Sequence, residues 1–219
     1  MDSKVSIQKG GYMDLSSPAR AVIPTLDAEV LMALVGITMP MTGRQIARLL
    51  EAKSHRGVSL VLERLRQQGI VDVVEAGSSN LYSLNRDHVA VSAVEALTDL
   101  RGKLFQRIRE AISNWEIAPI SVAVFGSAAR GDGGISSDID LLIIRPESTY
   151  SDEPMWDQQL SDLSFWVHRW SGNRASLIQA TPSEIASMIE RREPITESLR
   201  NDGRYLVGPN ILKSPPVGS

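Results

Sequence analysis

The sequence contains no cysteine, few aromatic residues and no excess of positive charge. Without thiols, disulfide bonds and thiolate metal sites are excluded, and this is typical of a cytoplasmic protein. No apolar run is long enough to cross a bilayer, and the N-terminus lacks the basic-then-apolar pattern of a signal segment. We therefore expect a cytoplasmic protein with no membrane partner.

The composition is otherwise that of a globular protein. The 219 residues are enough for one large domain or two small ones. The net charge is -3, whereas a protein that binds nucleic acid over its whole surface should be basic. Any nucleic-acid face must therefore be local, and it should be visible as charge asymmetry along the chain.

Glycines, prolines and apolar periodicity divide the chain into five parts. Residues 1–25 and 209–219 are rich in turn residues and lack periodic apolar positions, so we expect a flexible arm and a flexible tail. Residues 26–86 and 116–208 each have the patterns of a folded domain. Between them, residues 87–115 predict one long connecting helix, because apolar residues recur along it at helical spacing.

The first domain reads as three helices followed by a hairpin. Helical periodicity and capping residues predict helices over 27–37, 43–50 and 54–68. Residues 70–84 alternate as two short strands around a turn at 77–80. This order is that of winged helix-turn-helix domains, and the segment from Thr42 to Leu84 resembles bacterial regulators of that type.

The same segment carries a local positive charge. Between Gly43 and Gly69 there are six basic and two acidic residues, an excess of four positive charges in a chain of net charge -3. The resemblance places the start of the third helix in the major groove of double-stranded DNA. Base-reading candidates there are Ser54, His55, Arg56 and Ser59, and the candidates for phosphate contacts are Arg44 and Lys53. A protein–protein role for this domain stays open.

The second domain alternates strands and helices, which predicts an α/β layer structure. Residues 120–126 form an apolar strand that ends in glycine, and residues 136–144 form a second strand with two acidic residues. A helix over 155–170, a strand over 174–180 and a helix over 181–192 follow.

Asp138 and Asp140 are separated by one residue on the second strand. Side chains alternate along a strand, so both carboxylates should lie on the same face. Two adjacent carboxylates repel each other, and a divalent cation with a preference for oxygen ligands, such as Mg²⁺, relieves that repulsion. The alternative is a solvated strand face, which the apolar run 141–144 disfavours.

A glycine-serine pair ends the preceding strand. Gly126 has no Cβ, so a ligand can approach the backbone there. Ser127 offers a hydroxyl and an N–H at a turn, where phosphates bind. Arg130, one turn further on, could reach an anion. These three residues are therefore candidates for binding a triphosphate.

The segment GSAARGDGGISSDIDLLII is similar to the signature of the nucleotidyltransferase superfamily that includes DNA polymerase beta. It looks closest to the minimal nucleotidyltransferase branch, whose motif is GS, one residue, ARG, five residues and SDIDL. The resemblance implies a domain with a mixed sheet, an NTP whose triphosphate lies at Gly126 and Ser127, and Mg²⁺ at Asp138 and Asp140. The expected fold class thus combines α+β and α/β, with a winged helix-turn-helix before the nucleotidyltransferase domain.

One family feature is missing. The resemblance implies a third carboxylate on the next strand, and the equivalent position here is Ser176, a poor metal ligand and base. Glu184 is a substitute only if its helix starts near the metals, and Asp132 lies in a turn, where a solvated acid is the simpler interpretation. Whether the chain catalyses transfer therefore stays open.

Two functions follow. The first is an enzyme that transfers a nucleotidyl group from NTP to an unknown hydroxyl acceptor with Mg²⁺, while its first domain binds DNA. The second is a weak or inactive nucleotidyltransferase fold that acts as a nucleotide-sensing transcription regulator or antitoxin-like protein. The resemblance makes a toxin–antitoxin context plausible, with a toxin-like or helical RNase partner. The connecting helix would form the interface of a homodimer.

Overall fold

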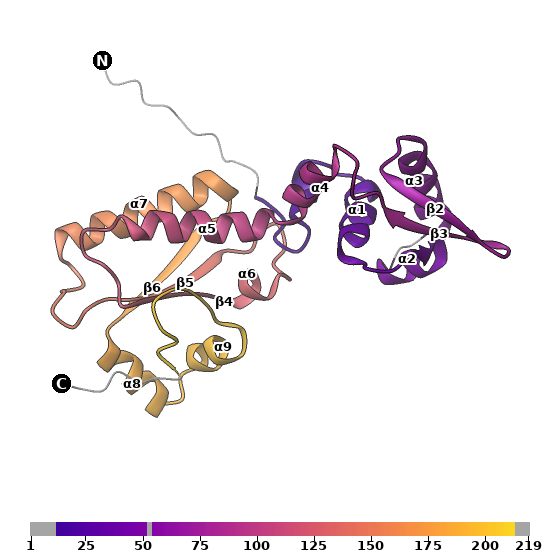
Figure 1. Cartoon of the computed structure of the whole chain (residues 1–219). Coiled ribbons are helices and arrows are strands. Elements are labelled where there is room, and N and C mark those ends of the chain that lie inside the picture. The colour runs from indigo at the N-terminus through magenta and orange to yellow at the C-terminus, as the bar shows by residue number, and fades with distance from the viewer. Residues whose placement is uncertain (1–11, 52–53, 213–219) are drawn as a thin grey trace, which may run out of the picture. The chain divides into compact units, whose positions relative to one another are not determined.

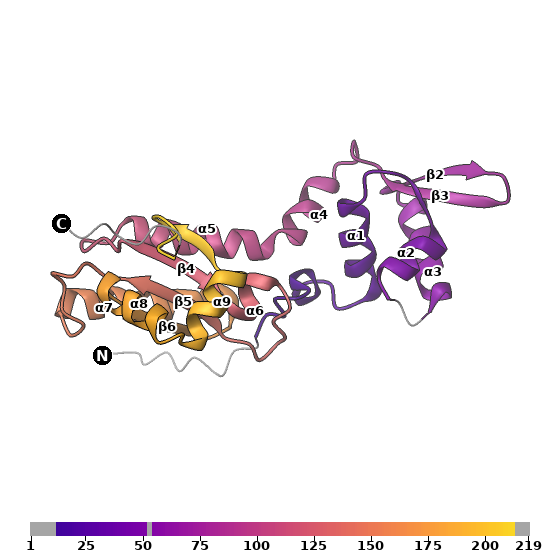
Figure 2. The same ribbon diagram turned by 90° about the horizontal axis from the view of Figure 1, so that it is seen from below.

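The computed structural model describes residues 12–51 and 54–212. They divide into two compact units (Figures 1 and 2). The helix–hairpin unit is Ser17–Arg101, and the sheet unit combines residues 12–16 with residues 102–212. Within the described part of the chain, no helix is both long and apolar enough to span a membrane.

The helix–hairpin unit has the predicted order of three helices and a hairpin. Its elements are η1 (Pro18–Ala21), α1 (Leu26–Gly36), β1 (Met41–Thr42), α2 (Gly43–Leu49), α3 (His55–Gln67), β2 (Val71–Ala76), β3 (Ser79–Leu84) and α4 (Val91–Thr98). Thr42 and Gln45 form a reciprocal capping box at the start of α2. The Ser54 hydroxyl accepts the Gly57 N–H at 3.2 Å and so fixes the start of α3.

The predicted single helix over 87–115 is wrong. The structure has two helices, α4 and α5 (Leu100–Ser113), which are separated at Asp99. Asp99 leaves the helical region with φ -103° and ψ 22°. The Thr98 hydroxyl donates to the Glu95 carbonyl at 2.8 Å, where the Asp99 N–H also donates. The Thr98 hydroxyl thus competes with a backbone N–H for the Glu95 carbonyl, which favours a helix end.

The sheet unit contains a mixed sheet, as predicted, but with four strands where the sequence predicted three. Its further elements are β4 (Ser121–Phe125), α6 (Gly126–Arg130), β5 (Ile139–Ile144), α7 (Pro154–Ser171), β6 (Ala175–Ala180), α8 (Pro182–Glu190), α9 (Pro194–Asp202) and β7 (Arg204–Val207). The strand order is β6-β5-β4-β7. β5 is antiparallel to β4 and parallel to β6, and β7 is antiparallel to β4.

Helices cover both faces of this sheet (Figure 1). One face buries Val122, Val124, Leu141 and Ile143 against residues of α5 and α7, and the other buries Ala123, Phe125, Leu142 and Ile144 against α8 and α9. Strand side chains alternate between these two cores, which explains why β5 is apolar at almost every position. Trp156 of α7 is fully buried and donates to the Gln179 side chain at 2.8 Å, so it belongs to the core.

The described parts of the expected arm and tail are packed. Leu15 is only 1% exposed, and the Met13 N–H donates to the Ser171 carbonyl. At the other end Ile211 is 3% exposed, and the Ser121 hydroxyl donates to the Pro209 carbonyl at 2.8 Å. Residues 12–16 and 209–212 therefore differ from the expected flexible ends, because each contributes an apolar side chain and backbone hydrogen bonds to the sheet unit. Residues 17–25 of the expected arm include the short helix η1 and belong to the helix–hairpin unit, and residues 1–11 and 213–219 lie outside the described ranges.

Candidate functional site

Asp138 and Asp140 lie at one end of β5. Asp140 is paired across the sheet with Phe125 on one side and Ser176 on the other. Asp138 precedes the strand and is exposed, whereas Asp140 is half-buried. Burial raises the pKa of the Asp140 carboxyl, a hydrogen bond from the Ser176 hydroxyl opposes that rise, and the nearby charge of Asp138 adds to it. The two carboxylates thus repel each other, as the one-residue spacing predicts.

Gly126 lies directly beside the Asp140 carboxylate. Its φ of +65° is in the left-handed region, and a Cβ built on it would lie 2.8 Å from Oδ2 of Asp140. A side chain at position 126 would therefore be strained and would displace the carboxylate. The structure thus brings the predicted phosphate-binding turn and the predicted metal ligand into contact.

Ser127 follows in the same turn. Its carbonyl accepts the N–H groups of Gly131 and Asp132, which closes α6 after five residues. A Cβ on Gly133 would lie 3.0 Å from the Ser127 hydroxyl, so the returning loop passes close over this side chain. Ser127 therefore lies between the glycine turn and the loop that leads to Asp138.

Arg130 is held by two carboxylates. Its Nε donates to Asp132 at 2.9 Å and its guanidinium donates to Asp202 of α9 at 2.6 Å. These hydrogen bonds raise the pKa of Arg130, and the same contact lowers the pKa of Asp132. The side chains of Arg130 and Asp132 are therefore hydrogen-bonded to each other. The triphosphate contact of Arg130 stays a prediction, which requires the guanidinium to exchange a carboxylate for a phosphate.

The backbone around Asp138 is fixed on both sides. The Asn173 side chain donates to the Ser137 carbonyl at 2.9 Å, and the Ile139 N–H donates to the Arg174 carbonyl at 2.8 Å. Asp138 itself is exposed, yet both neighbouring residues are hydrogen-bonded to the turn before β6. The chain therefore holds an exposed carboxylate in a defined place.

Asn173 was missed by the sequence reasoning. It is fully buried, and besides Ser137 its side chain exchanges hydrogen bonds with the backbone of Met13, accepting from N and donating to O. The Ser16 N–H donates to the Gly133 carbonyl at 2.9 Å, so the segment 12–16 contacts the site loop as well. An asparagine after a helix-ending glycine reads as an ordinary turn, and nothing local in the sequence indicates these partners.

Ser176 lies at the start of β6, whereas Glu184 lies on α8, beyond the end of that strand. Ser176 is directly opposite Asp140 in the parallel register. Glu184 caps α8, where its carboxylate accepts the Thr181 N–H at 2.7 Å, just beyond the far end of the strand. The helix that carries Glu184 therefore does not start near Asp138 and Asp140, so Glu184 does not replace the missing third carboxylate. Among the described residues, no group of three or more acidic, histidine or cysteine side chains could hold a metal ion.

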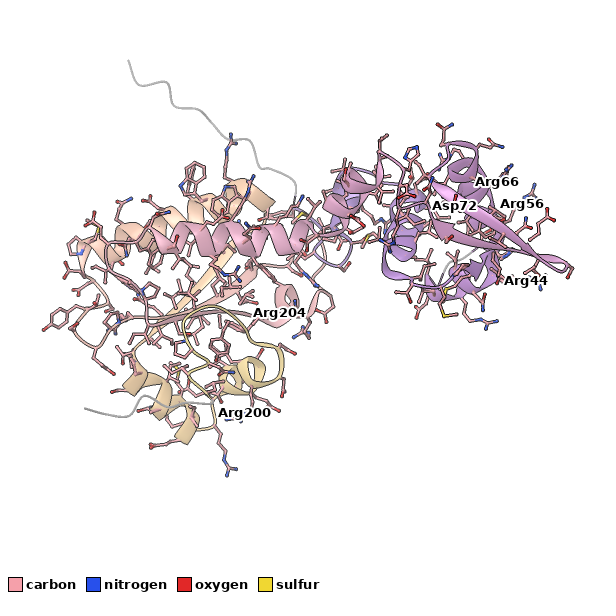
Figure 3. All side chains as sticks on the ribbon, viewed as in Figure 1. Arg44, Arg56, Arg66, Asp72, Arg200 and Arg204 are labelled. Carbon is pink, nitrogen blue, oxygen red and sulfur yellow. The ribbon has the colours of Figure 1, made fainter. Side chains whose placement is uncertain are left out.

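The predicted DNA-binding residues lie on α2 and at the start of α3. Arg44, His55 and Arg56 are exposed, and Figure 3 shows both arginines at the surface of the unit. The Ser54 hydroxyl caps the helix, and the Ser59 hydroxyl donates to the His55 carbonyl at 3.1 Å. Lys53 lies outside the described residues.

The basic side chains of this region fall into two groups. Arg64 pairs with Asp27 of α1, and Arg66 pairs with Glu63 at 2.6 Å. In contrast, Arg44, Arg48 and Arg56 make no ion pair within the described ranges. Residues Arg44, Ala47, Arg48, Glu51 and His55 line an open hollow. The unpaired positive charge is thus concentrated on α2 and the first turn of α3.

Comparison with known proteins finds a match in the second part of the chain. Residues 105–190 match the family model described as nucleotidyltransferase domain, a match that covers well under half of the chain. This stretch includes the glycine-serine turn, both aspartates and Ser176. The match supports the nucleotidyltransferase superfamily for this region, and nucleotidyl transfer as its general function. No curated protein and no solved structure matches the chain.

Proposed function

We propose that the sheet unit transfers a nucleotidyl group from an NTP in a Mg²⁺-dependent reaction. The observation that carries the proposal is the contact between Gly126 and Asp140, where a Cβ would lie 2.8 Å from the carboxylate oxygen. This close approach supports the proposal, because it brings the glycine-serine turn next to the Asp140 carboxylate, which lies two residues from Asp138. The family match over residues 105–190 supports the same reaction class.

The chain's own residues fit Mg²⁺. Asp138 and Asp140 supply two carboxylates, and Mg²⁺ commonly binds through one or two carboxylates together with substrate phosphates. When bound, the ion would neutralise charge on the triphosphate and polarise its α-phosphate. Asp138 and Asp140 would hold it, and Gly126 and Ser127 would position the triphosphate. Loss of the carboxylates should therefore remove both metal binding and transfer.

A double variant, Asp138→Asn with Asp140→Asn, tests this proposal. With radiolabelled NTP, Mg²⁺ and cell extract, the wild type should transfer label and the variant should not. All four tryptophans lie in the sheet unit, so their fluorescence follows its unfolding alone. Mg²⁺ at about 100 times its Kd should stabilise the wild type by about 2.7 kcal/mol and the variant by nothing. Without metal, the variant should melt at a higher temperature, because the carboxylate repulsion is gone.

Asp152→Asn is the matched control. Asp152 is an exposed carboxylate of the same unit, and its loss should change neither label transfer nor the effect of Mg²⁺. Equal label transfer by the wild type and the double variant would contradict the proposal.

We further propose that the helix–hairpin unit is a winged helix that binds double-stranded DNA. The unpaired arginines of α2 and α3 support it, because phosphate contacts need cations that are free to bind. Arg56→Ala should weaken binding by about 1–3 kcal/mol and relax the base preference. A suitable probe is a duplex that the wild type selects from a random-sequence pool, measured at one fixed salt concentration.

Arg66→Ala is the control for this experiment. Arg66 lies on the same helix but is already bonded to Glu63. Its loss should cost clearly less affinity than the loss of Arg56. Equal affinities for the wild type and the Arg56 variant would count against α3 as the reading helix.

The observation that Ser176 stands opposite Asp140 favours a second candidate. A site without another acid could bind NTP without transferring its nucleotidyl group, and the protein would then be a nucleotide-sensing regulator or antitoxin-like protein. NTP binding without label transfer in the experiment above would support this candidate. A toxin-like or helical RNase partner and a homodimer belong to the same proposal.

A further inference from the structure

Transfer to a hydroxyl group is assisted by a base. An alcohol stays protonated at neutral pH, and a positioned side chain that takes its proton as the new P–O bond forms accelerates the transfer by about 100-fold or more. Asp138 and Asp140 cannot do this while they hold a cation. The acceptor that the site can use therefore depends on which other side chains near β5 can accept a proton.

The described residues near the pair offer no free base. Ser176 is directly opposite Asp140, and a serine hydroxyl is a poor base at neutral pH. Asp132 and Asp202 are both bonded to Arg130. The nearest acid that follows β6, Glu184, is committed to the Thr181 N–H beyond the opposite end of the strand.

The same edge of the site offers a cation instead. Arg174 is exposed and forms no ion pair in the part of the chain that the structure describes. Its carbonyl accepts the Ile139 N–H, so its backbone continues the ladder between β6 and β5. It stands two residues before Ser176. Side chains alternate along an extended chain, which puts Arg174 on the same side as Ser176 and Asp140.

We propose that the acceptor is an oxyanion, a phosphate monoester or a carboxylate, that is bound by Arg174 and is already ionised when it attacks. This inference rests on the proposed nucleotidyl transfer. An oxygen of the acceptor forms a bond to the α-phosphorus of the NTP, and the bond from that phosphorus to the bridging oxygen of the β-phosphate breaks. Pyrophosphate leaves with the electron pair. No proton has to be removed from the nucleophile, so the absence of a base costs nothing.

The type of bond that joins the labelled nucleotide to its acceptor tests the proposal. This test works whichever molecule carries the acceptor group. Extract labelled with α-³²P NTP is treated with hydroxylamine, which cleaves acyl phosphates, and separately with an enzyme that cleaves only phosphoanhydrides. We expect one of the two to release the label. Pretreatment of the extract with a phosphatase should abolish labelling for a phosphate acceptor and leave it unchanged for a carboxylate acceptor. Label that resists both treatments is an ester of a hydroxyl and would overturn the inference while leaving nucleotidyl transfer intact.

Two substitutions give independent readouts. Arg174→Gln should raise the apparent KM for the acceptor, measured as the amount of extract that gives half-maximal labelling, about tenfold with little change in kcat, as expected for loss of a charge-assisted contact. Arg174→Lys should restore part of that loss. Arg169→Gln, an exposed arginine of α7, is the control and should behave as the wild type. An unchanged KM in the Arg174→Gln variant would overturn the role of Arg174.

The second substitution supplies a base. Ser176→Asp should allow transfer to a hydroxyl acceptor such as glycerol with a gain of about 100-fold over the wild type, because general-base catalysis contributes about that much or more. Ser176→Ala, which adds no base, should show no gain. Efficient transfer to glycerol by the wild type would contradict the inference. If neither the wild type nor any variant labels extract or glycerol, the nucleotidyl transfer itself fails and the inference fails with it.

Discussion

The two units hold the residues of their candidate sites in opposite ways. In the sheet unit, the site residues are fixed by hydrogen bonds from distant segments: Asn173 holds the residue before Asp138, and Arg130 is paired with two carboxylates. In the helix–hairpin unit, Arg44 and Arg56 extend from helices as exposed side chains without ion pairs in the described ranges. A reacting centre requires fixed distances. A phosphate-binding surface benefits from unpaired, adjustable cations.

Asn173→Ala should have the largest effect on the sheet unit. The substitution leaves the Ser137 carbonyl and the Met13 backbone without their side-chain partners in a buried place. We expect the free energy of unfolding to fall by about 2–4 kcal/mol, as measured by tryptophan fluorescence in urea. The control Asn114→Ala removes an exposed helix-end asparagine and should cost much less. Equal losses of unfolding free energy in the two variants would mean that the buried hydrogen bonds of Asn173 do not fix the site, and the contrast between the two units would fail.

Gly126→Ala should come next. The new Cβ needs a left-handed backbone and would approach the Asp140 carboxylate to 2.8 Å. A loss of about 1–3 kcal/mol in the free energy of unfolding is expected, together with loss of stabilisation by Mg²⁺. Gly134→Ala is matched to it, because a Cβ there meets nothing within 4 Å. If Mg²⁺ stabilises the Gly126 variant as well as the wild type, the glycine turn is not part of the metal site.

The smallest effect concerns the paired arginine of α3. The pKa of Glu63 is lowered from 4.5 to about 2. The hydrogen bonds from Arg66 are the largest cause, and the hydrogen bond from Gln67 is the second. Because this folded pKa is depressed, the pair stabilises the protein above pH 4.5 and the contribution is lost as pH falls from 4.5 towards 2. Carboxyl NMR titration of Glu63 should show the low pKa in the wild type and a clearly higher pKa in Arg66→Ala, which stays below 4.5 because Gln67 still donates to Glu63. A low value in both would mean that Arg66 is not the cause.

Local features were predictable from the sequence and long-range ones were not. The one-residue spacing of Asp138 and Asp140 and the glycine-serine pair after an apolar strand are each readable from neighbours in sequence. The resemblance to the nucleotidyltransferase motif then predicted that the two lie together. The strand β7 was missed because four residues after a glycine carry almost no periodic signal. The pairing of Arg130 with Asp202 and of Asn173 with Met13 joins residues 72 and 160 positions apart. No local pattern encodes such contacts.

The sheet unit is discontinuous, and this has a consequence for synthesis. Met13 leaves the ribosome 160 residues before Asn173, the residue that holds its backbone. At a translation rate of about 5–20 residues per second, the interval is roughly ten to thirty seconds. The helix–hairpin unit, which lies between them in the sequence, has emerged completely by then. The first segment of the sheet unit must therefore remain available until nearly the last strands are made, and the loop before Asp138 acquires its final anchor late in folding.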